Sequence, residues 1–142
     1  MWLYQGKEFT SEQIQDYKGF VYELTDTVNG MKYIGQKRFW KKITRPPLKG
    51  KKRKRRSLVE SDWQDYYGSN EAINLLVESE GQERFKREIL YLCNGTGEMN
   101  YMESKIQFDR DVLFRDDYYN RIIQCRIHAK HVGKMRNNLT NT

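Results

Sequence analysis

Residues 19–35, with the sequence GFVYELTDTVNGMKYIG, decide the fold, because two short apolar runs flank a single turn signal. Residues 20–24 form the first run and residues 31–34 form the second. Asn29-Gly30 lies between them and tolerates the positive backbone torsions of a tight turn better than other residue pairs do. The stretch therefore predicts a β-hairpin.

Alternation along the predicted hairpin places three polar side chains on one face. If Asn29 and Gly30 are the two loop residues, Tyr22 lies opposite Lys37 on the neighbouring strand. Since side chains alternate between faces with period two, Tyr22, Tyr33 and Lys37 project from the same face. This register separates the two tyrosines by roughly 13 Å, so twist or a bulge must bring them together if they share a substrate. The alternative is that both are ordinary strand aromatics.

Length and composition bound the class of protein. The chain has 142 residues, enough for one domain with a single core. Its 10 Tyr, 6 Phe and 3 Trp predict an aromatic-rich core and argue against disorder, despite a mean hydropathy of −0.95. No apolar run reaches the length of a membrane span, and the N-terminus lacks the pattern of a signal peptide. We therefore expect a cytoplasmic protein with no membrane partner.

The two cysteines and two histidines lack the spacing of a zinc site. We expect Cys93 and Cys125 to be a reduced, buried pair, as is usual in the cytosol. His128 and His131 are expected at the surface.

Positive charge is concentrated in one segment. The net charge is +7, but residues 37–56 contain twelve Lys and Arg and no acidic residue, so the rest of the chain carries −5 (7 minus 12). Pro46-Pro47 forbids a continuous helix and Gly50 adds freedom, so residues 45–56 are predicted to form a loop that orders on binding.

A solubilising loop or a localisation address would also explain this charge. Contact with phosphates is the simpler explanation, because a cationic segment releases counterions when it meets a polyanion. The predicted nucleic-acid-binding residues are Lys41, Lys42, Lys49, Lys51, Lys52, Arg53, Lys54, Arg55 and Arg56.

Local patterns predict the remaining elements. Residues 2–9 alternate as a small hairpin or an extended arm, and Thr10 with Gln13 has capping-box spacing for a helix to about residue 17. Residues 57–67 are compatible with a helix whose Trp63, Tyr66 and Tyr67 point inward. Further elements are a helix capped by Ser69 or Asn70 that ends at Gly81, a strand at 85–93 and a helix at 98–114. In the strand, we expect Ile89, Tyr91 and Cys93 on one side and Leu90 and Leu92 on the other.

Together these elements predict an α+β fold, a small, mainly antiparallel three-stranded sheet with flanking helices. An N-terminal extension at 1–18 packs on a domain at 19–125 that carries a basic insert at 41–56. A polar, basic tail follows at 126–142.

Glu103 lies at the margin of the apolar stripe of the last predicted helix, which Met99, Met102, Ile106 and Leu113 form. A partly desolvated carboxylate there is either paired with a neighbour, Lys105, Gln107 or Arg110, or a metal ligand.

Two motifs in the hairpin resemble those of a known family. Gly19-Phe20-Val21-Tyr22 followed by Lys32-Tyr33-Ile34-Gly35 is similar to the paired motifs of the GIY-YIG nuclease superfamily, with Phe-Val in place of the usual Ile. The order of elements up to Tyr119-Asn120 looks like the whole domain. The segments YIGQKRFW and ESDWQDYYGS make the chain most similar to small phage-encoded endonucleases of the seg homing type.

The resemblance implies a Mg²⁺-dependent DNA endonuclease, with Mn²⁺ as a possible substitute, in the host cytoplasm if the chain is phage-encoded. It assigns Glu103 as the metal ligand, Tyr22 as the general base or its relay, and Tyr33 to positioning of the phosphate or water. Asn120 matches the asparagine that follows the late helix, with Tyr118 in place of Gly before Tyr119. The phenol pKa near 10 would have to be lowered by a lysine or a hydrated metal.

The basic residue that would stabilise the phosphate is the point of departure from the family. The usual arginine falls at the position of Ile43, so the candidates are Lys37, Arg38 and Arg45. Lys37 is favoured because its side chain is predicted to project from the same face of the hairpin as Tyr22 and Tyr33.

Two other functions stay open. A non-catalytic nucleic-acid-binding module that kept the fold would explain the missing helical arginine, and an RNA-directed nuclease is a third possibility. The choice between monomer and homodimer also stays open, since one site cuts one strand.

Neutralising residues 51–56 is expected to weaken DNA binding and to flatten its salt dependence. Up to six phosphate contacts would be lost, each contributing roughly 0.9 to the slope of log K against log salt. Titration of labelled DNA at several salt concentrations measures this, and an unchanged slope would show that the block is merely solvated.

Overall fold

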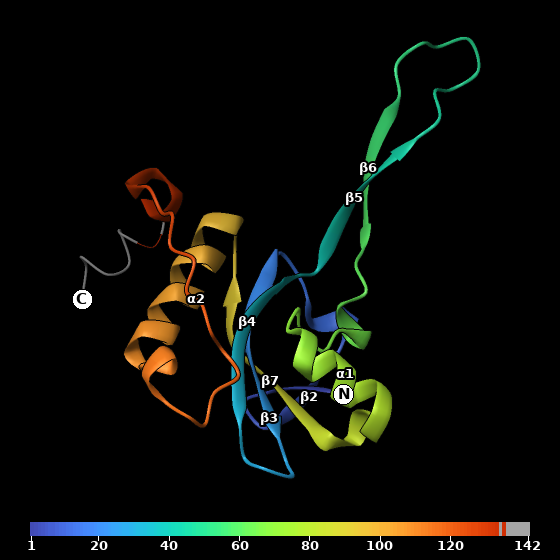
Figure 1. Cartoon of the computed structure of the whole chain (residues 1–142). Coiled ribbons are helices and arrows are strands. Elements are labelled where there is room, and N and C mark those ends of the chain that lie inside the picture. Colours follow the sequence, from blue (N-terminus) through green and yellow to red (C-terminus); the bar gives the residue numbers. More distant parts are fainter. Residues whose placement is uncertain (134, 136–142) are drawn as a thin grey trace.

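Five strands form the central sheet of the α+β fold in the computed structural model (Figure 1). The structure describes residues 1–133 and residue 135. The strand order is β2-β1-β7-β3-β4. The strands are β1 (Trp2–Tyr4), β2 (Lys7–Phe9), β3 (Gly19–Asp26), β4 (Lys32–Arg38) and β7 (Phe85–Cys93). All neighbours are antiparallel except β1 and β7, so the sheet is mixed.

The predicted sheet had three strands, whereas the observed sheet has five. β4, β3 and β7 are the predicted strands, but the N-terminal segment continues the sheet beyond β7 instead of only packing on it. Trp2 anchors β1 there, because its ring is 1% exposed and its Nε1 donates to the carbonyl of Trp63 at 2.7 Å. Alternation around Gln5-Gly6 indicated a hairpin, but pairing between segments so far apart in the chain leaves no local signal.

The two strands of the hairpin pair in a register that differs from the predicted one by two residues. Tyr22 lies opposite Gly35 and Leu24 opposite Tyr33, whereas Lys37 pairs with Phe20. The loop comprises residues 27–30, closed by a hydrogen bond from the Asp26 amide to the Met31 carbonyl at 2.8 Å. Because the shift is even, Tyr22, Tyr33 and Lys37 still share a face. The expected separation of the tyrosines was wrong, since their ring centroids are 6.3 Å apart.

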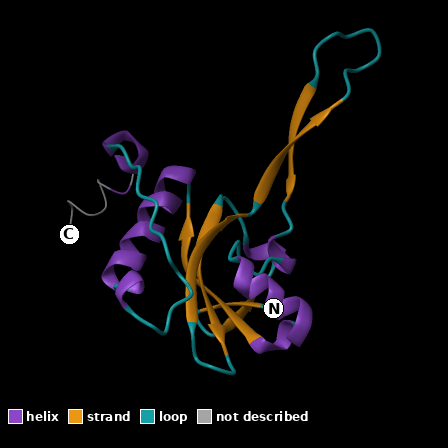
Figure 2. Ribbon diagram, in the orientation of Figure 1, coloured by secondary structure: helices purple, strands orange, loops and turns teal. Residues whose placement is uncertain are grey.

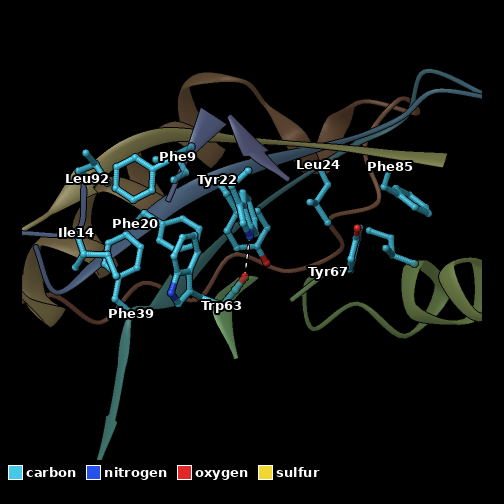
Figure 3. Close-up of a cluster of buried hydrophobic side chains, with 13 residues drawn as sticks. Phe9, Ile14, Phe20, Tyr22, Leu24, Phe39, Trp63, Tyr67, Phe85 and Leu92 are labelled. Atoms are coloured by element: carbon cyan, nitrogen blue, oxygen red, sulfur yellow. Dashed lines mark hydrogen bonds between the residues drawn. The ribbon is translucent and has the colours of Figure 1, made fainter. Parts of the chain in front are cut away.

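Each face of the sheet carries its own core and its own helix. One face buries an aromatic cluster, drawn in Figure 3, that includes Trp2, Phe20, Tyr22, Phe39 and Trp63 and is covered by α1 (Glu71–Glu80). The other face buries a smaller cluster of Val21, Ile34, Cys93, Met99, Val112 and Tyr118 under α2 (Thr96–Asp109). The two helices lie on opposite sides of the sheet in Figure 1.

β7 does not alternate regularly, which corrects the predicted facing of its residues. A register shift between Val21 and Tyr22 makes Val21 pair with Tyr91 but Tyr22 pair with Ile89. Ile89 and Leu92 therefore both join the aromatic cluster, whereas Tyr91 and Cys93 pack on the α2 side. The prediction grouped Ile89 with Tyr91 and Cys93.

The helix at the centre of the chain has the predicted ends. The Asn70 side chain caps α1 by accepting from the Ile73 amide at 3.1 Å, and Gly81 ends the helix with φ of 96°. The later helix is shorter than predicted, because Asp111 adopts a left-handed conformation and only a 3-10 turn, η4 (Val112–Phe114), follows. Leu113 is consequently 42% exposed rather than part of the core stripe.

Two predicted helices are single 3-10 turns. The capping box of Thr10 and Gln13 is present, but it opens only η1 (Ser11–Gln13), since Gln15 takes a positive φ. Residues 57–67 contain the end of a strand and η2 (Trp63–Asp65) in place of a helix. Trp63 and Tyr67 are buried as predicted. The remaining 3-10 turns are η3 (Gln82–Arg84) and η5 (Ala129–Val132).

A separate two-stranded ribbon projects from the body of the molecule (Figures 1 and 2). β5 (Trp40–Arg45) and β6 (Arg55–Glu60) pair from Trp40–Glu60 out to Arg45–Arg55. The predicted loop at 45–56 therefore shrinks to residues 46–54, because Pro46-Pro47 stands at the turn and leaves the strand hydrogen bonds intact. We call residues 40–60 the arm.

Three further expectations concern the surface and the chain end. Cys93 is buried as expected, but Cys125 is exposed, so the two do not form a buried pair. His128 and His131 are exposed as predicted. Within the described part of the chain, no helix has the length and hydropathy needed to cross a membrane. Residue 134 and residues 136–142 of the predicted tail lie outside the described residues.

A buried carboxylate holds the hairpin turn. Asp26 is fully buried and accepts hydrogen bonds from Arg84 Nε at 2.8 Å and Nη2 at 2.9 Å. The Tyr119 hydroxyl donates to it at 2.7 Å, and the Val28 amide at 3.0 Å. Burial by itself would raise the pKa of Asp26, but these hydrogen bonds and the Arg84 charge lower it from 3.8 to about 2.

The stability that Asp26 contributes is expected to be present at neutral pH and to be lost as the pH falls from about 4 to about 2, because its pKa is depressed in the folded state. Asp26→Asn should lower the free energy of unfolding at pH 7 by on the order of 3 kcal/mol, since the Arg84 charge loses its buried partner. Its stability should also fall less than that of the wild type between pH 4 and pH 2.

Urea unfolding followed by circular dichroism at each pH measures both effects. Asp16→Asn, which makes the same change at an exposed position, is the control. Equal acid sensitivity of the wild type and Asp26→Asn would contradict this role.

Candidate active site

Two glycines let the motif tyrosines approach the backbone. A Cβ on Gly35 would overlap the hydroxyl of Tyr22 and would lie 2.6 Å from its Cζ and 3.0 Å from Cε1 of Tyr33. On the other side, a Cβ on Gly68 would lie 3.3 Å from the Tyr22 hydroxyl. The chain at Gly68 also has φ of 91°, which favours glycine. The Tyr22 hydroxyl therefore sits in a slot between two backbone segments.

The Tyr22 hydroxyl is buried and keeps its proton. Its side chain is 1% exposed, and the ring of Tyr66 meets it edge-on with centroids 6.0 Å apart. Burial, followed by the neighbouring Tyr66 and Tyr33 and by Glu103, raises the pKa of Tyr22 well above 10.0. These surroundings favour the neutral hydroxyl of Tyr22, which donates and accepts hydrogen bonds.

Tyr33, Glu103 and Asn120 line one polar pocket of about 380 Å³. The Tyr33 hydroxyl reaches this pocket beside Ser69, whose Oγ is 3.3 Å away. Burial raises the pKa of Tyr33, although the hydrogen bond with Ser69 opposes the shift. Three residues from distant parts of the chain thus meet at one opening.

Asn120 clamps the C-terminal segment to the outer strand of the sheet. Its Oδ1 accepts from the Ile34 amide at 3.0 Å, and its Nδ2 donates to the Ile34 carbonyl at 2.9 Å. The side chain is 3% exposed, and flanking backbone bonds join Lys32 to Asp117 and Tyr119. Asn120 therefore holds the wall of the pocket in place.

Glu103 has the character expected of a ligand for a hard cation. Burial raises its pKa, while hydrogen bonds from Gln36 and Gln107 partly oppose this shift. The ion pairs considered with Lys105 and Arg110 do not form, because Lys105 binds Asp109 at 2.8 Å and Arg110 binds Glu23. Glu103 is thus left with amide partners in a desolvated place, where a cation would stabilise its charge.

The donor set fits Mg²⁺. Gln107 Nε2 donates to the Ile34 carbonyl and to Glu103, and its buried Oε1 has no hydrogen-bond partner among the described residues. Glu71 also lines this pocket, and one or two carboxylates with neutral oxygen donors suit Mg²⁺, which keeps several of its waters. No three His, Cys, Asp or Glu side chains gather within residues 1–133 and 135 in the way that a closed zinc site requires.

The three basic candidates lie at different distances from this pocket. Lys37 is nearest to the tyrosines, with its Nζ 4.2 Å from the centroid of the Tyr66 ring and 2.7 Å from Asp62 Oδ1. Arg38 is exposed and lines a second hollow together with Lys37. Arg45 lies at the outer end of β5, where its Nε donates to Ser57, so the fold does not bring it to the tyrosines.

Several residues of the site were not predicted from the sequence. Tyr66 packs on Tyr22 and under Lys37, Ser69 contacts Tyr33, and Gln36 holds Glu103. Glu71 and Arg121 also line the pocket. Tyr66 and Ser69 belong to the stretch ESDWQDYYGS, so the position of Gly68 between them was the available signal. Gln36 carried no signal, because an exposed and a buried glutamine look alike in sequence. Gln107 was predicted as a possible partner of Glu103, and its Nε2 donates to Glu103 Oε1 at 3.4 Å.

Gly35→Ala is expected to cost about 1–3 kcal/mol of folding stability, because the added methyl group displaces the Tyr22 ring. The cost should be smaller in a Tyr22→Phe background, since the hydroxyl makes the closest contact, so the two changes should be non-additive. Urea unfolding of the four proteins in this cycle measures the coupling.

Gly133→Ala is the control, because Gly133 has helical torsions and no atom within 4 Å of the added Cβ. Strictly additive costs for Gly35→Ala and Tyr22→Phe would show that the hydroxyl does not occupy the slot.

Comparison with known proteins identifies the family. The family sequence model described as "Putative endonuclease segE, GIY-YIG domain" matches residues 2–123 of the chain. These residues include both tyrosine motifs, Glu103 and Asn120. No curated protein and no solved structure gave a significant match. The match also includes β1 and β2, the strands that enlarge the sheet beyond three. The chain therefore belongs to the GIY-YIG domain family of seg-type endonucleases.

Proposed function

We propose that this protein is a Mg²⁺-dependent endonuclease that hydrolyses phosphodiester bonds in DNA. The observation that carries the proposal is the meeting of Tyr33, Glu103 and Asn120 at one polar pocket beside the Tyr22 slot. Membership of the family supplies the reaction class. The basic arm supplies the charge that a polyanionic substrate requires.

Each residue has a role that its surroundings permit. Glu103 would hold Mg²⁺, or Mn²⁺ in its place, which when bound supplies charge stabilisation at the phosphate and a more acidic water. The Tyr33 hydroxyl reaches the pocket and can donate to a phosphate oxygen or orient a water. Tyr22 stays protonated above neutral pH, so it acts as a hydrogen-bond donor or a proton relay.

Lys37 is the basic residue best placed to act on the phosphate. It shares a strand with Tyr33, and its Nζ lies at the edge of the hollow next to the pocket. Asp62 neutralises it in the absence of substrate. A phosphate would compete with Asp62 for this ammonium group.

Nicking of supercoiled plasmid tests the proposal. The wild type should convert supercoiled to open-circular DNA with Mg²⁺ or Mn²⁺ and should not do so in EDTA. Glu103→Gln should lower the nicking rate by about 100-fold or more, because several kcal/mol of transition-state stabilisation depends on the bound cation. Glu78→Gln removes the same charge from an exposed position on α1 and should leave the rate unchanged.

DNA binding is measured in parallel by fluorescence anisotropy. Plasmid that stays intact under all conditions while binding persists would favour the non-catalytic binding module. Preferential cleavage of RNA in competition would favour the RNA-directed nuclease.

A further inference from the structure

A cationic hollow lies between the base of the arm and the start of α2. Its volume is about 790 Å³, and its wall includes Trp40, Lys42 and Leu58 from the arm and residues 94–96 at the helix start. Five cationic side chains line it: Lys18, Lys37, Arg38, Lys41 and Lys42. Asp62 is the acidic residue in this wall, and Lys37 neutralises it.

Gln36 links the wall of the hollow to the candidate active site, because it lines the hollow and also hydrogen-bonds Glu103. Gln36 and Asn100 line the hollow, and Gln36 Nε2 donates to Asn100 Oδ1 at 2.8 Å. Glu103 follows Asn100 by about one helical turn and opens into the neighbouring pocket. A phosphodiester backbone in the hollow would therefore lie one helical turn of α2 away from Glu103.

The arm is cationic on both of its faces. Directly paired residues share a face, so Lys42 and Arg56 mark one face, and Lys41, Arg45 and Arg55 mark the other. Leu58 on the first face is 59% exposed. In Figure 1 the arm extends away from both helices and the sheet, so the described elements cover neither face of its outer half.

This charge pattern distinguishes between ways of binding. A ribbon that rests on a polyanion with one face needs cations on that face alone, whereas a ribbon between two rows of phosphates needs them on both. A two-stranded hairpin is also marginally stable in water by itself, so a ligand that encloses it would stabilise it. The major groove of B-DNA, about 12 Å wide, admits such a ribbon, whereas the minor groove, about 6 Å wide, does not.

We propose that the arm enters the major groove of duplex DNA while the hollow at its base holds the backbone of the strand to be cut. This inference rests on the proposed function for the identity of the substrate. Six-residue strands extend about 20 Å, which is less than one helical turn of about 34 Å. The arm is then the element that reads DNA in a chain whose other described parts build the nuclease domain.

The test uses the full chain with Glu103→Gln, so that binding is measured without cutting. The probe is a labelled DNA duplex of 30 base pairs, read by anisotropy at several salt concentrations. One variant neutralises the first face with Lys42→Gln and Arg56→Gln, and a second neutralises the other face with Arg45→Gln and Arg55→Gln. A control neutralises the exposed Lys7 and Lys86 on β2 and β7.

Each face variant is expected to weaken binding by about 10-fold and to lower the salt slope by about 2, while the control changes neither. An A-form RNA duplex of the same sequence should bind at least 10-fold more weakly, because its major groove is deep and narrow. A second-face variant that binds like the control, or equal binding of RNA and DNA, would overturn the inference.

Methylation protection locates the arm directly. Guanine N7 lies in the major groove, so the protein should protect guanines from dimethyl sulfate. Protection should disappear when Asn-Gly, a two-residue hairpin turn, replaces residues 42–58 and removes most of the paired strands of the arm. Unprotected guanines in a saturated complex would overturn the inference.

The two proposals fail separately. Wild-type protein that nicks plasmid but leaves guanine N7 accessible overturns the placement of the arm and keeps the nuclease. Protein that protects guanine N7 but never nicks overturns the nuclease and keeps the arm.

Discussion

The buried carboxylate of Asp26 is the constraint on which the register of the central hairpin depends. Its hydrogen bonds to Arg84, Tyr119 and the Val28 amide end β3 at this residue and leave a loop at residues 27–30. Once the loop is fixed, Tyr22 must lie opposite Gly35, the residue whose missing side chain makes room for its hydroxyl. A charge that must be satisfied inside the protein thereby determines where a tyrosine lies at the site.

The outer position of β4 in the sheet explains how the pocket is assembled. An edge strand has backbone groups without a strand partner, and those of Ile34 are taken by Asn120 and Gln107. One residue thus joins the C-terminal segment and α2 to the hairpin. Glu103 precedes Gln107 by about one helical turn, so the same contact positions the candidate metal ligand beside Tyr33.

Charge is separated between the two parts of the molecule. The pocket is lined by the carboxylates of Glu71 and Glu103 and by the cation of Arg121, whereas five cations and one carboxylate line the hollow at the base of the arm. In the proposed nuclease the cations of the hollow and the arm would attract the polyanion, and the carboxylates of the pocket would attract the metal ion.

The sequence by itself determined the elements whose signals are local. The presence of the central hairpin and the Asn70 cap with the Gly81 stop were read correctly, and the two tyrosine motifs led to the family. The tertiary structure alone decided the pairing of β1 with β7, the bulge that turns Ile89 toward the aromatic cluster, and the burial that keeps Tyr22 protonated. It also decided that the basic segment is a ribbon and that Arg45 lies at its outer end. The physical reason is range, because turns and caps depend on neighbours within a few residues, whereas strand pairing, desolvation and the free edge of β4 depend on contacts between distant segments.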